Sequence, residues 1–427
     1  MRSCSGGEGG VTRRRVLRAV GAGALAAAVA PLAGCGASDG RTTIRFLMNK
    51  PEVVDQFARM VADFNASQQA VRVVLDTTPV AIIPQFARGE PPDIACYNYR
   101  AEAALFTTKG VLSDLGDMPE AAQIAPAYRD LAASYGTYRD ETSVLPFSIT
   151  AAGTIYNPQL FAEHGVAVPR TWTELVTACE TFAAAGITPL YSTHRAEGLW
   201  PLTQGLFDYV AGSTLDVAGF FRRLIAAGPD VSAPFTTEFA PAVRRMIELR
   251  RWLNPDADTR TYYDGNLAFG DGRAAMYLQG PWALGEVAKV NPDAPVATFP
   301  LPATDDPALT TARVNVDLGV WIPRSTRKQE AARAFLSYLF RPDVVNSYNA
   351  ANLAQSPLRG APAQPDPRLA GLQPAIDAGR IQPGASTFVS EAIPLGSYLQ
   401  EALQTGDDAT FLQRLDTDWQ RLAARSA

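Results

Sequence analysis

The sequence predicts an α/β fold with at least two domains, and three observations lead to this expectation. Strand and helix patterns alternate between residues 43 and 97, at a spacing that implies a parallel sheet. Residues 153–305 are richer in helical patterns than the part before them. About 390 residues remain after an N-terminal export segment is removed, which is enough for two domains or more.

The export segment, residues 1–34, has the parts of a secretory signal peptide. A basic stretch, Thr12–Arg18, precedes a short apolar run that ends in Leu32-Ala33-Gly34-Cys35. The run is shorter than the roughly 20 residues that span a bilayer, although an uncleaved anchor is the alternative. The basic stretch resembles a twin-arginine export signal, with the general secretory route left open. The end resembles a lipobox, which implies that Cys35 is lipidated, that residues 35–41 form a tether, and that the protein lies on the outer face of the cell membrane.

The elements of the N-terminal part follow from the hydrophobic pattern. Residues 43–48 and 71–75 have the composition of strands. Between them, apolar side chains from Val53 to Phe64 recur at helical spacing. A third strand starts at Ile94, after a Pro-Pro turn, and these three strands form the predicted parallel sheet.

The remaining elements are mainly helical. Thr171 or Thr173 is the expected cap of a helix. Residues 264–278 predict a helix, a glycine turn and a strand, and residues 314–323 predict a long strand or a strand pair. Further helices are expected at residues 330–340, 390–403 and 408–425. We expect Cys96 and Cys179 to be free, buried thiols.

Charge and histidine content exclude several classes of function. The chain without residues 1–34 has a net charge of about −9, so no basic excess is present to bind nucleic acid. Only His164 and His194 occur, which argues against histidine-based triads and multi-histidine metal sites. Carboxylate pairs for glycoside hydrolysis stay open, because acidic residues are plentiful. No metal and no cofactor are expected.

Four stretches of the chain carry short motifs in a characteristic order. They are Gly89-x-Pro91-Pro92-Asp93-Ile94 with Gly110–Leu115, Leu145-Pro146-Phe147 with Ile155–Leu175, Phe269–Met276 with Gly280-x-Trp282, and Ala331–Leu339. Together with the lipobox, this ordered set resembles an ABC-transporter extracellular solute-binding protein of the carbohydrate-binding family, the maltose-binding-protein-like family 1.

The resemblance implies a type II periplasmic-binding-protein-like fold, in which two α/β lobes joined by a hinge enclose the ligand cleft. The expected lobes are residues 42–147 with 311–355, and residues 148–310 with 356–427. It also implies a monomeric, non-catalytic receptor. This receptor captures a mono- or oligosaccharide or an amino sugar and delivers it to a membrane permease that a cytoplasmic ATPase powers. The alternatives are an extracellular carbohydrate-active enzyme and an adhesion or scaffold lipoprotein.

Three candidate ligand contacts stand at the ends of predicted strands. In parallel sheets, ligands bind beyond the carboxyl ends of the strands, where Asn49, Tyr97 and Asn98 stand. Asn49 could instead cap the following helix, and Tyr97 and Asn98 could be ordinary loop residues. Asp93, before the third strand, is a candidate contact or closes its own turn.

Aromatic side chains are expected in a sugar site because sugar C–H faces pack on rings. Trp282 is the main stacking candidate, since the turn at Gly280 swings it out of regular structure; the alternative is a hydrophobic plug. Gly280 is itself a candidate ligand contact. Phe147 and Ser148 stand where the family crosses between lobes, so Phe147 packs in the hinge or contacts sugar. Trp321 could stack from its strand, with core burial as the alternative. Further aromatic candidates are Trp200 and Tyr263.

Two charged residues complete the predicted site. Asp317 lies among apolar residues and needs a partner, either sugar hydroxyls or an arginine. Its segment Val316–Gly319 replaces a Gly-Gly pair that is common in the family, which makes Asp317 a candidate for specificity. Arg380 could donate two hydrogen bonds into the cleft or form a surface salt bridge.

Overall fold

The computed structural model describes residues 40–426, apart from residues 49, 51–52, 79–81, 196–198 and 229–231. The predicted signal peptide, Cys35 and Asn49 lie outside the described residues. Within the described part, no helix is both long enough and apolar enough to cross a membrane.

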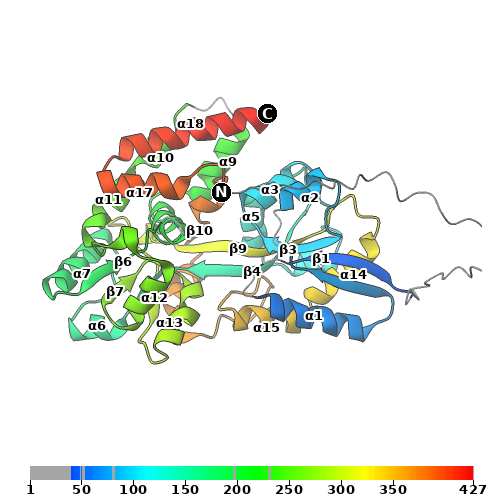
Figure 1. The fold of residues 1–427 in the computed structure, drawn as a ribbon, viewed down its shortest axis with the longest axis horizontal. Coiled ribbons are helices and arrows are strands. Elements are labelled where there is room, and N and C mark those ends of the chain that lie inside the picture. The colour runs from blue at the N-terminus through cyan, green and yellow to red at the C-terminus, as the bar shows by residue number, and fades with distance from the viewer. Residues whose placement is uncertain are drawn as a thin grey trace, which may run out of the picture. The chain divides into compact units, whose positions relative to one another are not determined.

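The first lobe is built on a six-stranded sheet with the order β10-β9-β3-β1-β2, in which β4 also pairs with β9 (Figure 1). Its strands are β1 (Thr42–Leu47), β2 (Val71–Asp76), β3 (Ile94–Asn98), β4 (Leu145–Ala152), β9 (Ala312–Trp321) and β10 (Ile381–Gln382). The pairs β1–β2 and β1–β3 are parallel, as the sequence predicts. Both β3 and β4 run antiparallel to β9, which makes the sheet mixed.

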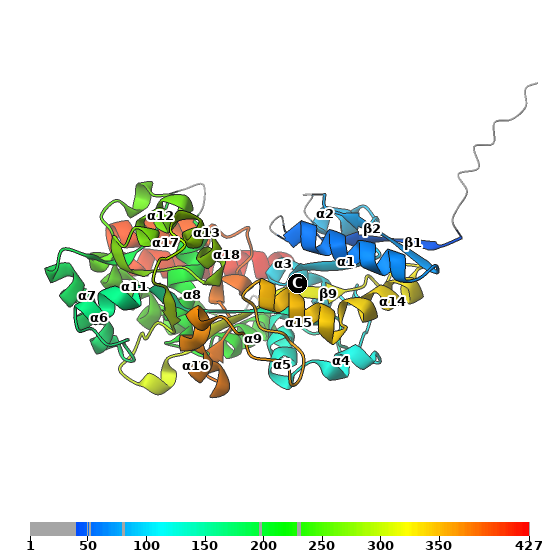
Figure 2. The same cartoon turned by 90° about the horizontal axis from the view of Figure 1, so that it is seen from below.

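Helices cover both faces of this sheet. They are α1 (Val54–Ser67), α2 (Ile82–Ala87), α3 (Ala101–Thr108), α4 (Pro119–Gln123), α5 (Pro126–Tyr135), α14 (Gln329–Leu339) and α15 (Pro342–Ala351). Figures 1 and 2 show α1, α14 and α15 along one face, while α2, α3 and α5 lie on the opposite face in Figure 1. The helical spacing of Phe57, Val61 and Phe64 buries one side of α1 against the sheet.

The second lobe is built on a four-stranded sheet with the order β6-β7-β5-β8. Its strands are β5 (Thr154–Tyr156), β6 (Thr188–Tyr191), β7 (Ala274–Tyr277) and β8 (Ala297–Phe299). Its helices are α6 (Pro158–Glu163), α7 (Trp172–Ala184), α8 (Asp208–Gly212), α9 (Val217–Ala227), α10 (Pro234–Glu238), α11 (Ala240–Leu249), α12 (Tyr262–Gly270), α13 (Leu284–Val290), α16 (Gln373–Asp377), α17 (Leu395–Thr405) and α18 (Asp408–Ser426). Thr171, one of the two predicted caps, accepts a hydrogen bond from the Glu174 amide at the start of α7.

The long strands β4 and β9 join the two lobes. They pair from Leu145 with Val320 to Ala152 with Arg313, and Figure 1 shows them running side by side between the two sheets. Residues 312–321 are therefore one continuous strand rather than a strand pair. After Gly153 the chain enters β5 of the second sheet, so the predicted lobe boundary at residues 147–148 falls within β4. The predicted lobe boundaries stay a prediction.

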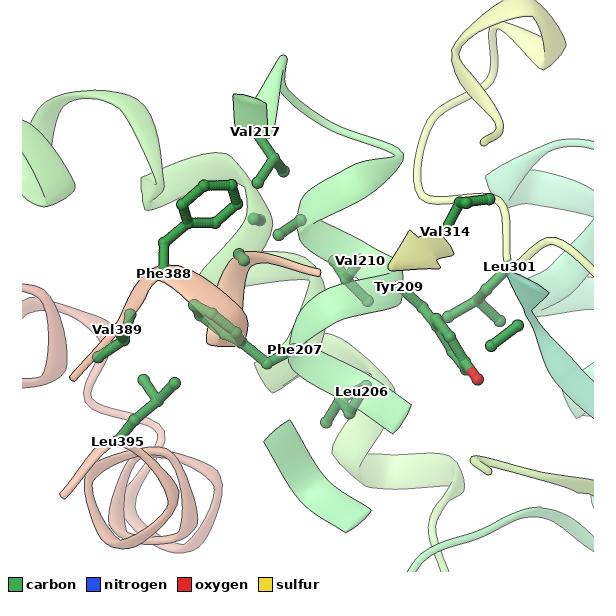
Figure 3. Packing of buried hydrophobic residues seen from close by; sticks show 14 of the residues in the cluster. Leu206, Phe207, Tyr209, Val210, Val217, Leu301, Val314, Phe388, Val389 and Leu395 are labelled. Atoms are coloured by element: carbon green, nitrogen blue, oxygen red, sulfur yellow. The ribbon is translucent and has the colours of Figure 1, made fainter. Parts of the chain in front are cut away.

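The largest apolar core contains residues of both lobes. Figure 3 shows its second-lobe part, in which Phe207 and Val210 lie in one group with Phe388, Val389 and Leu395. Phe388 also stacks on Tyr135 of α5, with ring centroids 4.9 Å apart. Full burial of each such side chain stabilises the fold by roughly 1.5–3 kcal/mol. Cys96 and Cys179 are buried and free, as predicted.

Candidate binding cleft

A cavity of about 340 Å³ lies where residues of both lobes meet. Asn98 at the end of β3 and the next two residues, Tyr99 and Arg100, border it on the first-lobe side. Strands β4 and β9 contribute Thr150, Arg313 and residues 315–317. The second lobe contributes aromatic, aliphatic and polar residues, which include Leu199, Trp200, Thr203, Gln204, Trp282, Ser386, Thr387, Val389, Ser390, Glu391 and residues 393–397. The lining is both polar and apolar, which suits a ligand with hydroxyl groups and C–H faces.

Trp282 lines this cavity from a short turn, Pro281–Ala283, that follows β7. Its indole Nε1 donates to Gln279 Oε1 at 2.7 Å, which holds the ring in place. The Trp200 ring is 6.1 Å away, centroid to centroid, and also lines the cavity. A Cβ atom on Gly280 would lie 2.5 Å from the Trp282 ring, so glycine allows the indole to lie close to the backbone. Gly280 therefore positions Trp282 and is not itself a lining residue.

Asn98 and Asp317 line the cavity together. Asn98 Nδ2 donates to the Asp317 backbone oxygen at 2.9 Å and to Asp317 Oδ1 at 3.2 Å. Lys50 Nζ is 2.8 and 2.9 Å from the two carboxylate oxygens of Asp317. The sequence predicts sugar hydroxyls or an arginine as the partner of Asp317, whereas the structure pairs it with Lys50. This ion pair keeps that part of the cavity close to neutral.

The structure places Tyr97, Phe147, Ser148 and Trp321 outside the cavity lining. Phe147, Ser148 and Trp321 are at most 1% exposed, and Phe147 and Trp321 pack against other aromatic rings. Ser148 lies in β4, and its hydroxyl has no hydrogen-bond partner within the described part of the chain. Tyr97 is half-buried and packs against the large core. For Phe147 and Trp321, the structure thus shows the packing role that the sequence left as an alternative.

The structure also places Arg380 away from the cavity. Its backbone oxygen accepts from the Ala312 amide at 3.0 Å, which extends the contact between β10 and β9. Arg380 lines a separate depression together with Pro169 and Pro374. Tyr263 is 66% exposed and His194 is buried, and neither lines the cavity.

Asp93 lies at the opposite end of β3 from Asn98 and closes a turn there. Its carboxylate accepts hydrogen bonds from Thr326 Oγ1 at 2.5 Å, the Arg45 amide at 2.8 Å and Lys328 Nζ at 3.0 Å. Burial alone raises the pKa of this carboxyl, but these three bonds outweigh it, so the pKa lies below its ordinary value of 3.8. These contacts agree with the second role predicted for Asp93, that of a residue that closes its own turn.

Replacing Asp93 by asparagine is expected to lower the free energy of unfolding by about 1–2 kcal/mol at pH 7. A lowered pKa stabilises the folded state above pH 3.8, and this contribution is lost as the pH falls through the folded-state value. Denaturant unfolding should therefore separate Asp93→Asn from the wild type at pH 7 and bring the two together in acid. A constant difference at every pH would contradict this account of Asp93.

Arg313 and Asn315 also line the cavity, although neither is among the contacts predicted from the sequence. They stand on β9 with Asp317 at every second position, and alternate residues of a strand point to the same face. The pattern Arg313-x-Asn315-x-Asp317 therefore predicts that these three polar side chains share one face of the strand, and we call them the polar strip. Gln204 was also missed, and its position in the sequence offers no comparable signal.

Comparison with known proteins places these features in a family. Residues 50–346, more than half of the chain, match the family described as bacterial extracellular solute-binding protein. The multiple sugar-binding protein of Streptococcus mutans is 24% identical over 336 residues, which cover 74% of this chain and 77% of that protein. An ABC transporter extracellular-binding protein of Pyrococcus horikoshii is 23% identical over 282 residues, which cover 65% of this chain and 60% of that protein.

Solved structures show the same two-lobed, type II fold. The apo form of RafE from Streptococcus pneumoniae superposes with a TM-score of 0.75 at 21% identity, over 90% of this chain and 98% of that one. RafE in complex with raffinose gives a TM-score of 0.70 at 20% identity, over 90% and 100% of the two chains. This likeness shows that the predicted fold class is correct.

Proposed function

The chain belongs to the family of bacterial extracellular solute-binding proteins, and from this premise we propose that it captures a carbohydrate for an ABC importer. The observation that carries the proposal is the cavity between the lobes, where Trp282 and Trp200 lie beside the polar strip Arg313, Asn315 and Asp317. Indole faces pack on the C–H faces of sugar rings, while guanidinium, amide and carboxylate groups bind hydroxyls. The printed names of the relatives, a multiple sugar-binding protein and a raffinose complex, support the same class of ligand.

The proposed mechanism is closure of the two lobes over the sugar. A ligand that contacts Asn98 of the first lobe and Trp282 of the second bridges both, so it binds the closed state better than the open one. The closed form then docks on a membrane permease that a cytoplasmic ATPase powers. The receptor acts as a monomer without a cofactor, and mono- or oligosaccharides and amino sugars are the candidate ligands.

A thermal-shift screen over a panel of saccharides tests the proposal. A sugar present at 100 times its dissociation constant should add about 2.7 kcal/mol to the free energy of unfolding. The sugar should also be recovered unchanged after prolonged incubation, because a binding protein does not turn it over. If no saccharide raises the melting temperature, the proposed function is wrong. Hydrolysis of a bound oligosaccharide would instead favour the carbohydrate-active enzyme.

We further propose that the chain is anchored to the outer face of the cell membrane through a lipidated Cys35, after twin-arginine export. The support is the basic stretch, apolar run and Leu32-Ala33-Gly34-Cys35 end of the first 35 residues. Replacing Cys35 by serine should move the protein from the membrane fraction to the soluble extracytoplasmic fraction. A membrane-bound Cys35→Ser protein would point to an uncleaved anchor instead.

A further inference from the structure

A buried ion pair between Arg313 and Asp208 lies beside the cleft. Arg313 Nε donates to Asp208 Oδ2 at 2.7 Å, and the two side chains are only 4% and 0% exposed. Arg313 belongs to β9, which joins the lobes, while Asp208 begins α8 of the second lobe. Burying two charges costs desolvation energy, so such pairs contribute little net stability. The pair therefore points to a role other than stability.

The carboxylate of Asp208 is held from a third segment as well. The Ser386 amide donates to Asp208 Oδ1 at 2.7 Å, and Ser386 Oγ donates to Oδ2 at 2.9 Å. A Cβ atom on Gly384 would lie 2.2 Å from Asp208 Oδ2 and 2.7 Å from Arg313 Nε, so only glycine leaves room for the pair. Asp208 itself does not line the cavity. Its orientation is set by Arg313 and Ser386, which do line the cavity.

The neighbours of Asp208 extend this support to the main aromatic candidate. Phe207 and Tyr209 on either side of it are buried, and Figure 3 shows both among the core side chains. The Tyr209 hydroxyl donates to the Gln279 backbone oxygen at 3.0 Å, and the Gln279 side chain accepts from the Trp282 indole at 2.7 Å. The ion pair and Trp282 are thus fixed to one another by the same helix.

The guanidinium of Arg313 has donors left for a ligand. Its Nη2 is 3.4 Å from Gln204 Oε1, and its central carbon lies 5.6 Å from the centre of the Trp282 ring. Nη1 makes no hydrogen bond to any residue that the structure describes, and Arg313 lines the cavity. A guanidinium carries five N–H donors in one plane, so fixing Nε also fixes the direction of the others.

We propose that Arg313 donates hydrogen bonds to the ligand beside Trp282 and that Asp208 is the positioning residue that holds the guanidinium there. This inference rests on the proposed function and narrows its ligand class to uncharged saccharides. Asp208 compensates the charge of Arg313, and Lys50 compensates that of Asp317. These paired charges favour a neutral ligand whose hydroxyl groups donate and accept hydrogen bonds over a charged ligand. Asp208 does not line the cavity and acts on the ligand through Arg313.

The test measures affinities by titration calorimetry for the best saccharide of the panel and for its uronic acid analogue. Asp208→Asn and Arg313→Lys should each weaken binding of the neutral sugar by about 10- to 100-fold. The double variant should bind about as well as the weaker single variant, because both changes remove the same contact. Asp208→Asn should also raise the affinity for the uronic acid relative to the neutral sugar, since it leaves the charge of Arg313 uncompensated.

Asp416→Asn is the matched control. Asp416 is also buried in the second lobe, where it accepts hydrogen bonds from the Phe235 amide at 2.7 Å and from Thr236, and it does not line the cavity. This variant should lower the melting temperature and leave both affinities within about twofold. A general loss of packing would change affinity in the control as well, and would not raise the affinity for the acidic sugar relative to the neutral one.

The outcomes separate the two proposals. A wild type that binds no saccharide overturns the proposed function and this inference with it. A wild type that binds, together with Asp208→Asn and Arg313→Lys variants of unchanged affinity, overturns this inference alone. If Asp208→Asn does not fold, Arg313→Lys decides, because it keeps the positive charge and loses only the planar donors. Full affinity in that variant also overturns the inference.

Discussion

Replacing Trp282 by alanine is expected to weaken binding of the best saccharide by about 1–3 kcal/mol, which is roughly a 5- to 150-fold loss of affinity. The indole lines the cavity and is held by its hydrogen bond to Gln279, so the free protein already presents the ring and loses little entropy on binding. Isothermal titration calorimetry of the two proteins measures the difference directly.

The matched control for this experiment is Trp252→Ala. Trp252 is also a partly buried tryptophan of the second lobe, but it does not line the cavity. This variant should lose stability and keep its affinity. Unchanged affinity in Trp282→Ala would remove Trp282 from the site, and an equal loss in both variants would mean that the second lobe as a whole was disturbed.

Replacing Phe147 by alanine is expected to lower the free energy of unfolding by about 3–5 kcal/mol. The ring is 0% exposed and lies 5.0–5.8 Å, centroid to centroid, from the rings of Phe57, Phe340 and Tyr348. Truncation leaves a cavity in the middle of this cluster, which the surrounding rings fill only in part. Denaturant unfolding with and without sugar gives both the stability and the affinity of the variant.

Phe147→Leu serves as the conservative comparison, because it keeps most of the buried volume and should cost less than the alanine variant. Both variants should bind sugar as the wild type does wherever they are folded. If a variant bound sugar more weakly while its free energy of unfolding changed little, Phe147 would instead be a ligand contact.

The order of the elements in the first lobe could be predicted because local pattern and burial agree there. The apolar spacing of α1 and the strands β1 and β2 follow from residues that are close in the sequence. The antiparallel pairing of β9 with both β3 and β4 could not be read in the same way. These partners are more than 150 residues away from β9 in the chain, and periodicity contains no information about such distant pairs.

The candidate site was predicted in part, for a reason that lies in the strands. A strand end identifies the edge where a ligand binds, but successive side chains point to opposite faces. Asn98 therefore lines the cavity, while Tyr97 packs against the core. Asp93 stands near the same strand, yet at its other end. The sequence makes both Trp282 and Trp321 candidates for stacking on sugar. The fold places Trp282 in the cavity lining and buries Trp321, which is 1% exposed.

The sequence by itself determined the α/β class, the order of most elements and the resemblance to solute-binding proteins, because these depend on short-range periodicity and local motifs. Only the tertiary structure decided which side chains share the cavity. Arg313, Asp208 and Ser386 come from three distant segments and meet because β9 joins the two lobes beside α8. Such a meeting depends on packing between elements, where burial and hydrogen bonding outweigh any local preference.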